Sequence, residues 1–443
     1  MDTRKLDTGS EDAISWLPHE VLGDILSRVP TKLAASTSVL SKKWRDMFAL
    51  VHNLDFDNSV FLQPEDGKRE RDEVRECFRN FVDRTLALQC ASPLKKFSLK
   101  YHIGDDSEMD HMYPSIRNAV ERVVVELDVS IEPTYGVILL PYEFFMSKTL
   151  VKLTLGTRVS FGKFPSDLSL PALKSLILDS VIFEYEDLCH VLLPGCPVLE
   201  DLVVRHKYFE ALPYCISSRS IKKLSVHYDC ELELGPYSIM SFDAPSLVSL
   251  DYSDYALAIY EQVNLASLVE AKLDIRYSKR IERPDVSSLI EGICNVETLH
   301  LSPGSVDVIS RCVKRGIILP LFNNLVSLSF GSKNNEGWEL LPYLLEQCPK
   351  LETLIIQGLD SYRGDVTIHP SQVKVLRVLG YGGTAKELED LKKLIGESEC
   401  LEVVQVEVVQ GAVEDGGVIS QTYNDLRRLL GVSLPSKCKI MVA

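Results

Sequence analysis

A short apolar pattern that recurs along most of the chain constrains the fold more than any other feature of the sequence. An apolar residue is followed by two others, a second apolar residue, one other, and a third apolar residue. The thirteen instances are Leu94-Phe97-Leu99, Val120-Val123-Val125, Leu150-Leu153-Leu155, Leu173-Leu176-Leu178, Leu199-Leu202-Val204, Ile221-Leu224-Val226, Leu247-Leu250-Tyr252, Leu268-Ala271-Leu273, Val296-Leu299-Leu301, Leu325-Leu328-Phe330, Leu351-Leu354-Ile356, Val373-Leu376-Val378 and Leu401-Val404-Val406. Their starts are on average about 26 residues apart, which is a period typical of repeat architectures.

Each instance predicts a short strand, because its last two apolar positions alternate with other residues as in a strand with one buried face. The segments between strands can supply the return limb, and residues 186–193 and 339–346 are expected to be helical. Each of these is followed by a Cys-Pro phrase, at Cys196 and Cys348. A helix that ends before proline and leads into a strand is the unit expected of an α/β solenoid. Because the two cysteines hold equivalent places, we expect small buried side chains rather than reactive or metal-binding thiols.

The first fifty residues do not carry this repeat and predict a helical module. Apolar residues recur there at helical spacing, Pro18 suits a first helical turn, and Pro30 ends the run. Ser41 can cap a further helix that carries Trp44. A few dozen residues bury too little surface to be securely stable alone. We therefore expect the module to complete its core against a partner, the alternative being a helical cap for the domain behind it.

The module resembles the F-box of plant F-box proteins in Leu17-Pro18, Val21-Leu22, Ile25-Leu26, Val29-Pro30 and the run from Val39 to Arg45. The resemblance implies docking to the Skp-type adaptor of a cullin-RING ubiquitin ligase. The adaptor-binding residues it implies are Leu17, Pro18, Val21, Leu22, Ile25, Leu26, Val29, Pro30, Val39, Leu40 and Trp44, with Lys42, Lys43 and Arg45 aiding steering. Some of these must pack within the module, and the sequence does not sort them. Gly23 departs from the pattern and costs about 1 kcal/mol relative to alanine if it is exposed.

The repeat region resembles the irregular leucine-rich repeats common in plant F-box proteins, and residues 373–404 resemble the FBD segment that often closes them. A glycine-rich turn there, Gly380 to Gly383, precedes a helix and could cradle a phosphate. However, Thr384 and Glu387 make a capping box that explains the turn without a ligand. The expected fold is α+β, with a small N-terminal three-helix F-box followed by an irregular α/β leucine-rich-repeat solenoid. The expected segments are the F-box at 12–58, a charged linker and helix at 59–93, repeats at 94–345, and the last repeats with the FBD-like segment at 346–443.

Charge and cysteine content limit the classes of partner and the cellular compartments that we expect for this chain. The chain has 48 basic and 63 acidic side chains and a net charge of -15, which argues against nucleic-acid and anionic-membrane binding. Residues 14–50 instead carry five basic and three acidic side chains, a balance that favours an acidic partner. No signal peptide or run of about 18 apolar residues is present. The 11 scattered cysteines suit reduced thiols, so we expect the cytoplasm, the nucleus or both.

No catalytic motif is visible in the sequence. It contains no Gly-x-Ser-x-Gly elbow, His-Glu-x-x-His or paired Cys-x-x-Cys, and the adjacent Cys189 and His190 point about 100° apart on a helix. We expect no enzyme activity, cofactor or metal. The predicted role is a substrate-recognition subunit of a Skp-cullin-F-box type ubiquitin ligase, which holds an unknown target protein on its repeats. The alternatives are a binding scaffold outside any ligase and a small-molecule-gated receptor on the same fold.

Overall fold

The computed structural model describes residues 17–60, 71–89, 93–103, 107–122, 124–133, 136–140, 145–165, 167–183, 187–207, 213–231, 239–359, 362–364, 366, 372–395, 400–408, 424–428 and 438–442. The chain divides into two compact units, Met1–Val181 (unit 1) and Ile182–Ala443 (unit 2). Each unit contains a parallel sheet whose strands follow one another in chain order.

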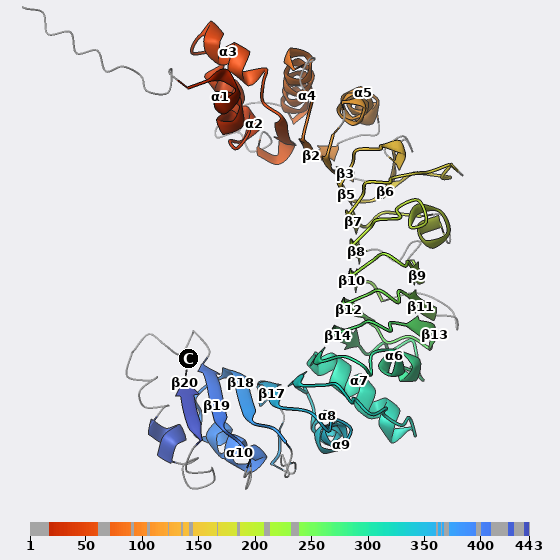
Figure 1. The fold of residues 1–443 in the computed structure, drawn as a ribbon, viewed down its shortest axis with the longest axis vertical. Helices are drawn as coiled ribbons and strands as arrows, with labels where there is room; N and C mark the ends of the chain where they lie inside the picture. The colour runs from red at the N-terminus through yellow and green to blue at the C-terminus, as the bar shows by residue number, and fades with distance from the viewer. Residues whose placement is uncertain are drawn as a thin grey trace, which may run out of the picture. The chain divides into compact units, whose positions relative to one another are not determined.

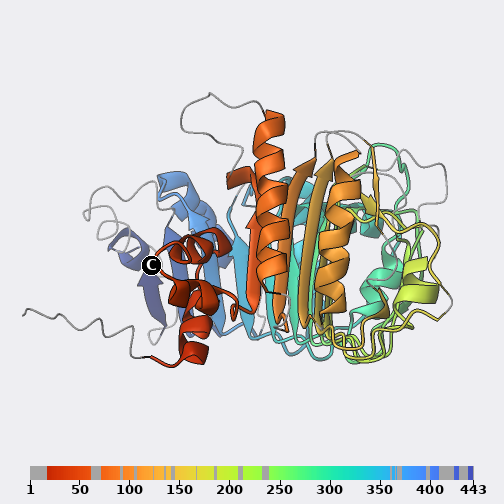
Figure 2. The same ribbon diagram turned by 90° about the horizontal axis from the view of Figure 1, so that it is seen from above.

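Unit 1 begins with three short helices and continues as alternating strands and helices. Its helices are α1 (His19–Leu26), α2 (Thr31–Thr37), α3 (Lys42–Phe48), α4 (Arg71–Leu88) and α5 (Ser107–Glu121), with a helical turn η2 (Asn58–Val60). Its strands are β1 (Asn53–Asp57), β2 (Lys96–Ile103), β3 (Glu126–Pro133), β4 (Ile138–Leu139), β5 (Lys152–Gly156), β6 (Val159–Ser160) and β7 (Ser175–Asp179). The parallel sheet has the order β1-β2-β3-β5-β7, and β4 pairs with β6. Helices α4 and α5 lie side by side over one face of this sheet (Figure 2).

Unit 2 repeats the strand and return-limb arrangement. Its main sheet consists of β8 (Asp201–His206), β10 (Lys223–Tyr228), β12 (Ser249–Tyr255), β14 (Glu270–Arg276), β15 (Thr298–Leu301), β16 (Ser327–Phe330), β17 (Thr353–Gln357), β18 (Val375–Tyr381), β19 (Val403–Val408) and β20 (Lys439–Val442). The return limbs include the helices η4 (Leu188–Leu192), α6 (Ser287–Gly292), α7 (Pro303–Lys314), α8 (Asn335–Trp338), α9 (Leu340–Glu346) and α10 (Ala385–Ile395). A second sheet of β9 (Cys215–Ser217), β11 (Ile239–Asp243) and β13 (Ile259–Asn264) lies on the same side of the main strands as α6 (Figure 1).

The buried face of the strands explains the recurring pattern. Leu224 of β10 pairs with Leu202 and Leu250 on the neighbouring strands, and all three side chains are at most 1% exposed. Twelve of the thirteen predicted instances mark a strand in this way, and all of their apolar residues are buried. The instance at 120–125 was wrong, because Val120 belongs to α5. The buried residues before and within β3 are instead Val124, Leu127 and Val129.

The sheet of unit 1 begins earlier than the sequence analysis predicts. Strand β1 pairs in parallel with β2, and it carries the same pattern in Val51, Leu54 and Phe56, all at most 1% exposed. This strand therefore lies inside the range predicted for the F-box. Helix α4, predicted as part of a linker, packs on the sheet, and its Phe78 stacks on Tyr101 with ring centroids 5.7 Å apart. It is thus the return helix between β1 and β2.

The predicted return helices and packed cysteines are confirmed. Segment 186–193 contains η4 and segment 339–346 contains α9. Cys196 and Cys348 follow them at 1% and 4% exposure, and burial raises the pKa of each thiol to about 12. Neither thiol ionises near neutral pH, which agrees with a packing role. The return limbs that form strands, β9, β11 and β13, were not predicted.

Candidate functional site

The N-terminal module is a three-helix unit with its own small core. Pro18 and Pro30 stand directly before α1 and α2, and Ser41 caps α3 by accepting a hydrogen bond from the Trp44 backbone N–H at 3.3 Å. Leu22 and Leu26 are 1% and 4% exposed and form the core with Ala34, Met47 and Phe48. The predicted helical module is therefore confirmed.

Gly23 is a packing position rather than an exposed interruption. A Cβ atom at this residue would lie 2.9 Å from Cβ of Leu50, closer than real Cβ atoms come to one another. The residue is buried in α1. Glycine therefore allows the segment after α3 to approach α1, and the helix-propensity cost expected at this position is offset by that approach.

Five large apolar side chains of α1, α2 and the turn that follows α2 are exposed. They are Val21 (41%), Ile25 (48%), Leu33 (56%), Val39 (85%) and Leu40 (72%). Burying such a side chain completely is worth about 1.5–3 kcal/mol, so leaving five of them in water within twenty residues forgoes a large stabilisation. Exposed apolar surface at this density indicates an interaction site.

The structure sorts the predicted adaptor-binding residues by exposure. Pro18, Val21, Ile25, Pro30, Val39 and Leu40 are exposed, whereas Leu17, Val29 and Trp44 are partly exposed. Leu22 and Leu26 are buried among the helices, and we correct the predicted set by removing these two, since a side chain inside the core cannot also contact a partner. Leu33 was missed because it lies in the polar segment of α2. It also lines, with Phe56 and Phe81, a cavity of about 470 Å³ between α2, β1 and α4.

Hydrogen bonds attach the module to the first strand. The Ser27 hydroxyl accepts from the His52 backbone N–H at 3.1 Å, and the Thr31 hydroxyl accepts from the Asp55 backbone N–H at 2.7 Å. The Gln89 side chain at the end of α4 donates to the Phe48 carbonyl at 3.1 Å. The backbone edge of β1 is therefore covered by α2 instead of facing solvent.

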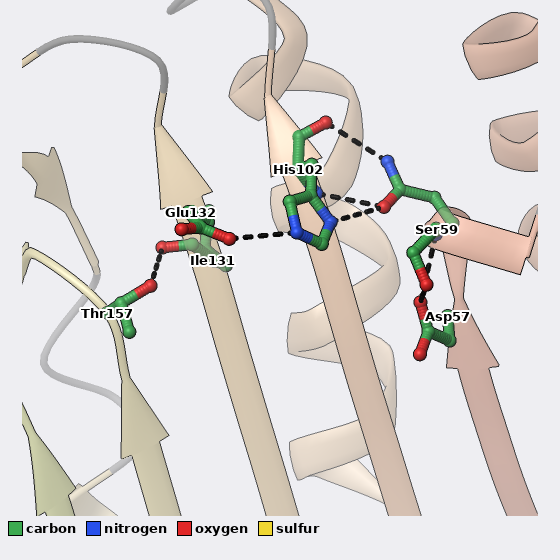
Figure 3. A network of polar contacts seen from close by, with 7 residues as sticks. Asp57, Ser59, His102, Ile131, Glu132 and Thr157 are labelled. Carbon is green, nitrogen blue, oxygen red and sulfur yellow. Dashed lines mark hydrogen bonds and ion pairs between the residues drawn. The ribbon is translucent and has the colours of Figure 1, made fainter. Parts of the chain in front are cut away.

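A polar network closes the ends of β1, β2 and β3 (Figure 3). Asn58, 1% exposed, accepts from the His102 backbone N–H at 2.9 Å and donates to the His102 carbonyl at 3.0 Å. The Asn58 side-chain amide thus makes the hydrogen bonds to β2 that a further backbone residue of β1 would make. The His102 ring lies 3.1 Å from Asn58 Oδ1 and 2.8 Å from Glu132 Oε2. Glu132 is mostly exposed, the His102 side chain is 44% exposed, and both Asn58 hydrogen bonds join the ends of strands, so we assign this network to structure.

In the glycine-rich turn before α10, the backbone N–H groups bind a carboxylate of the protein itself. The Glu387 carboxylate accepts from the backbone N–H groups of Gly382 and Thr384 at 3.0 and 2.9 Å, and the Thr384 hydroxyl accepts from the Glu387 N–H at 3.1 Å. Burial alone would raise the pKa of Glu387, but these hydrogen bonds outweigh it and lower the pKa. The predicted capping box is confirmed, and it occupies the amides that a phosphate would need.

No group of three or more His, Cys, Asp or Glu side chains is arranged to hold a metal ion in the described part of the chain. Among the same residues, no helix combines the length and apolar content needed to cross a bilayer. Cys189 is buried in η4, and its thiol donates a hydrogen bond to the Cys215 carbonyl. This contact ties η4 to β9.

The chain is similar to known proteins in both of its parts. Residues 14–55 match the F-box domain model, and residues 115–272 match the model described as "FBD-associated F-box protein At5g56370, LRR repeats". F-box/LRR-repeat protein At3g60040 of Arabidopsis thaliana is 53% identical over 452 residues, covering 100% of both chains. F-box/LRR-repeat protein At1g06630 of the same plant is 52% identical, covering 92% of this chain and 100% of its own.

Among solved structures, the LRR protein LIC12759 of Leptospira interrogans is 13% identical and covers 90% of this chain and 97% of its own, with a TM-score of 0.27. Two chains superpose poorly at that score, so family membership rests on the sequences. The match to At3g60040 covers all of this chain, and therefore both the helical module and the repeats. The chain therefore belongs to the family of F-box/LRR-repeat proteins.

Proposed function

We propose that this chain is the substrate-recognition subunit of a Skp-cullin-F-box type ubiquitin ligase. The F-box docks a Skp-type adaptor and through it a cullin, and the repeats hold a target protein near the transferring enzyme. The contribution of this chain is proximity, since it brings two reactants together without taking part in the chemistry. We propose the cytoplasm or nucleus as its compartment, on the ground that the cysteines among the described residues form no disulfide bonds.

The observation that carries this proposal is the exposed apolar surface of the F-box. Val39 and Leu40 are 85% and 72% exposed, and Leu33 is 56% exposed. A second protein that covers these side chains would recover the free energy they forgo in water. The basic residues beside them, Lys42 and Arg45, are exposed and suit an acidic adaptor.

Two double variants test the proposal with matched exposure. Leu33→Lys with Val39→Lys places charge on the F-box surface. Ile318→Lys with Leu321→Lys does the same on unit 2, where these residues are 80% and 55% exposed. Both pairs lie in solvent, so both variants should fold like the unmodified chain.

The assay is co-expression with a plant Skp-type adaptor, followed by size exclusion and titration of the purified pair. Complete burial of such a side chain is worth about 1.5–3 kcal/mol, and we weight this value by the exposed fractions of Leu33 and Val39. The F-box variant should then lose about 2–4 kcal/mol of adaptor-binding free energy, roughly 30- to 700-fold in Kd. The unit 2 variant should bind as the unmodified chain does. Equal binding by both variants, or an unmodified chain that elutes without the adaptor, would leave the scaffold interpretation in place of the ligase one.

A further inference from the structure

Arg377 lies at the centre of the open face of the last repeats. In β18 its neighbours in sequence, Leu376 and Val378, are at most 1% exposed and form the buried face. Because side chains alternate along a strand, Arg377 points to the opposite face. The register places it between Ile355 of β17 and Gln405 of β19.

One N–H group of the Arg377 guanidinium lacks an acceptor among the described residues. It is the Nε–H, which is buried and has no hydrogen-bond partner, and Arg377 makes no ion pair with a described residue. Two other cations of the same region are paired, Lys374 with Glu352 at 2.6 Å and Lys393 with Glu389 at 3.3 Å. Arg377 therefore carries a positive charge that no ion pair with a described residue offsets. An acidic group of a second molecule would offset it.

Apolar side chains lie near Arg377 on the open face, along β18 and on both neighbouring strands, together with Gln405, which is directly beside it on β19. The apolar residues are Ile355, Val375, Leu379, Val403 and, on β20, Met441, which is 46% exposed; with Arg377 they form what we call the Arg377 strip. On β10 to β14 the same face carries paired charges instead, such as His227 with Asp251 at 3.9 Å and Lys272 with Glu270 at 3.8 Å. The Arg377 strip thus combines one unmatched cation with apolar contact area.

We propose that the Arg377 strip binds an extended segment of the target protein in which an Asp or Glu side chain is flanked by apolar residues. The carboxylate accepts hydrogen bonds from the guanidinium, and the flanking residues pack on the apolar side chains of the strip. Neighbouring strands are about 4.8 Å apart, so a segment crossing β17 to β19 meets Ile355 on one side of Arg377 and Gln405, with Val403 two residues before it, on the other. A single arginine suits a carboxylate, whereas phosphorylated segments are bound by arginine clusters.

The inference rests on the proposed function, because that function assigns target binding to the repeats. A pair of peptides tests the inference. The probes are the end-blocked peptides GSLVDVLG and GSLVNVLG, which differ only in the carboxylate. The proteins are the full chain, Arg377→Gln, and Arg205→Gln as a control on the open, exposed side of β8. Binding is measured by calorimetry at low salt.

The unmodified chain and Arg205→Gln should bind the acidic peptide at least about tenfold more tightly than its amide twin, and Arg377→Gln should bind the two alike. A preference that survives in Arg377→Gln, or no saturable binding of the acidic peptide up to about 1 mM, would overturn the inference. Equal urea unfolding of Arg377→Gln and the unmodified chain, followed by the fluorescence of Trp338 in unit 2, shows that this variant is folded. Failure of the unmodified chain to copurify with the adaptor contradicts the proposed function and leaves the peptide result to be judged separately.

Discussion

Asp254 of β12 gives unit 2 a predictable dependence on pH. Its carboxyl group is 2% exposed and lies on the face where other strands carry apolar side chains. It accepts hydrogen bonds from the Tyr252 hydroxyl at 2.9 Å and from the Tyr255 backbone N–H at 2.6 Å. Burial raises the pKa of Asp254 to about 7 from 3.8, although both hydrogen bonds and Arg276 act in the lowering direction. The folded chain therefore holds a proton that the unfolded chain releases near pH 4.

The direction and size of this pH dependence follow from the linkage between proton binding and folding. A carboxyl group whose pKa is higher in the folded state contributes stability below its unfolded pKa and loses it as pH rises to the folded pKa. Each pKa unit is worth 1.36 kcal/mol, so a rise from 3.8 to about 7 corresponds to about 4 kcal/mol lost between pH 4 and pH 7. Asp254→Asn removes this loss, because the amide stays neutral while its oxygen can still accept from Tyr255. The variant should match the unmodified chain near pH 4 and exceed its stability by up to about 4 kcal/mol at pH 8.

The assay is urea unfolding of the full chain followed by Trp338 fluorescence. Trp338 is fully buried in unit 2, and Trp16→Phe with Trp44→Phe removes the other two tryptophans. Asp251→Asn, on the open side of the same strand, controls for the loss of a carboxylate. If the difference between Asp254→Asn and its parent stays constant from pH 4.5 to pH 8, the protonated carboxyl group is not the source of the pH dependence and the reasoning fails.

Three further substitutions have outcomes set by their local contacts. Gly23→Ala should destabilise unit 1 by about 1 kcal/mol, because overpacking against Leu50 outweighs the gain in helix propensity. The exposed Glu20→Ala should change little, and both are followed in urea by the fluorescence of Trp44 in unit 1, with Trp16→Phe and Trp338→Phe removing the other two tryptophans. Asn58→Ala leaves the His102 N–H and carbonyl without partners and should cost about 2–4 kcal/mol, with Ser59→Ala as the mild comparison. Arg377→Met should raise the free energy of unfolding of unit 2 by about 1 kcal/mol, since it removes an unpaired N–H, and an equal or lower value would show that the guanidinium is already satisfied.

The strand positions could be predicted because each depends on a few buried apolar residues near one another in sequence. Val51, Leu54 and Phe56 carry the same signal, and the strand they mark was missed only because it adjoins the F-box. The shifted strand β3 shows the limit of the pattern. Val125 fits it as well as Val124 does, but Val124 is buried and Val125 is 37% exposed.

The sorting of the F-box residues could not be predicted because α1 carries two apolar stripes. Val21 and Ile25 form one, and Leu22 and Leu26 form the other. Both repeat at helical spacing, so periodicity alone does not say which stripe faces the core. Only the approach of the other two helices buries Leu22 and Leu26. Arg377 is similar, since a polar residue on the open face is readable from alternation, whereas its lack of an acceptor depends on which strands flank it.

The hydrogen bonds between the F-box and β1 change how truncations of this protein should be designed. Removing residues 1–60 is an obvious way to delete the F-box. It also removes β1 and the helix α2 that covers β1, and it leaves β2 as an uncovered edge strand. Uncovered edges pair with other chains, so such a fragment is prone to aggregate, whether or not it has lost a docking surface. The helices that would meet the adaptor thus also shield the sheet, and point substitutions at Leu33 and Val39 separate the two roles where a deletion merges them.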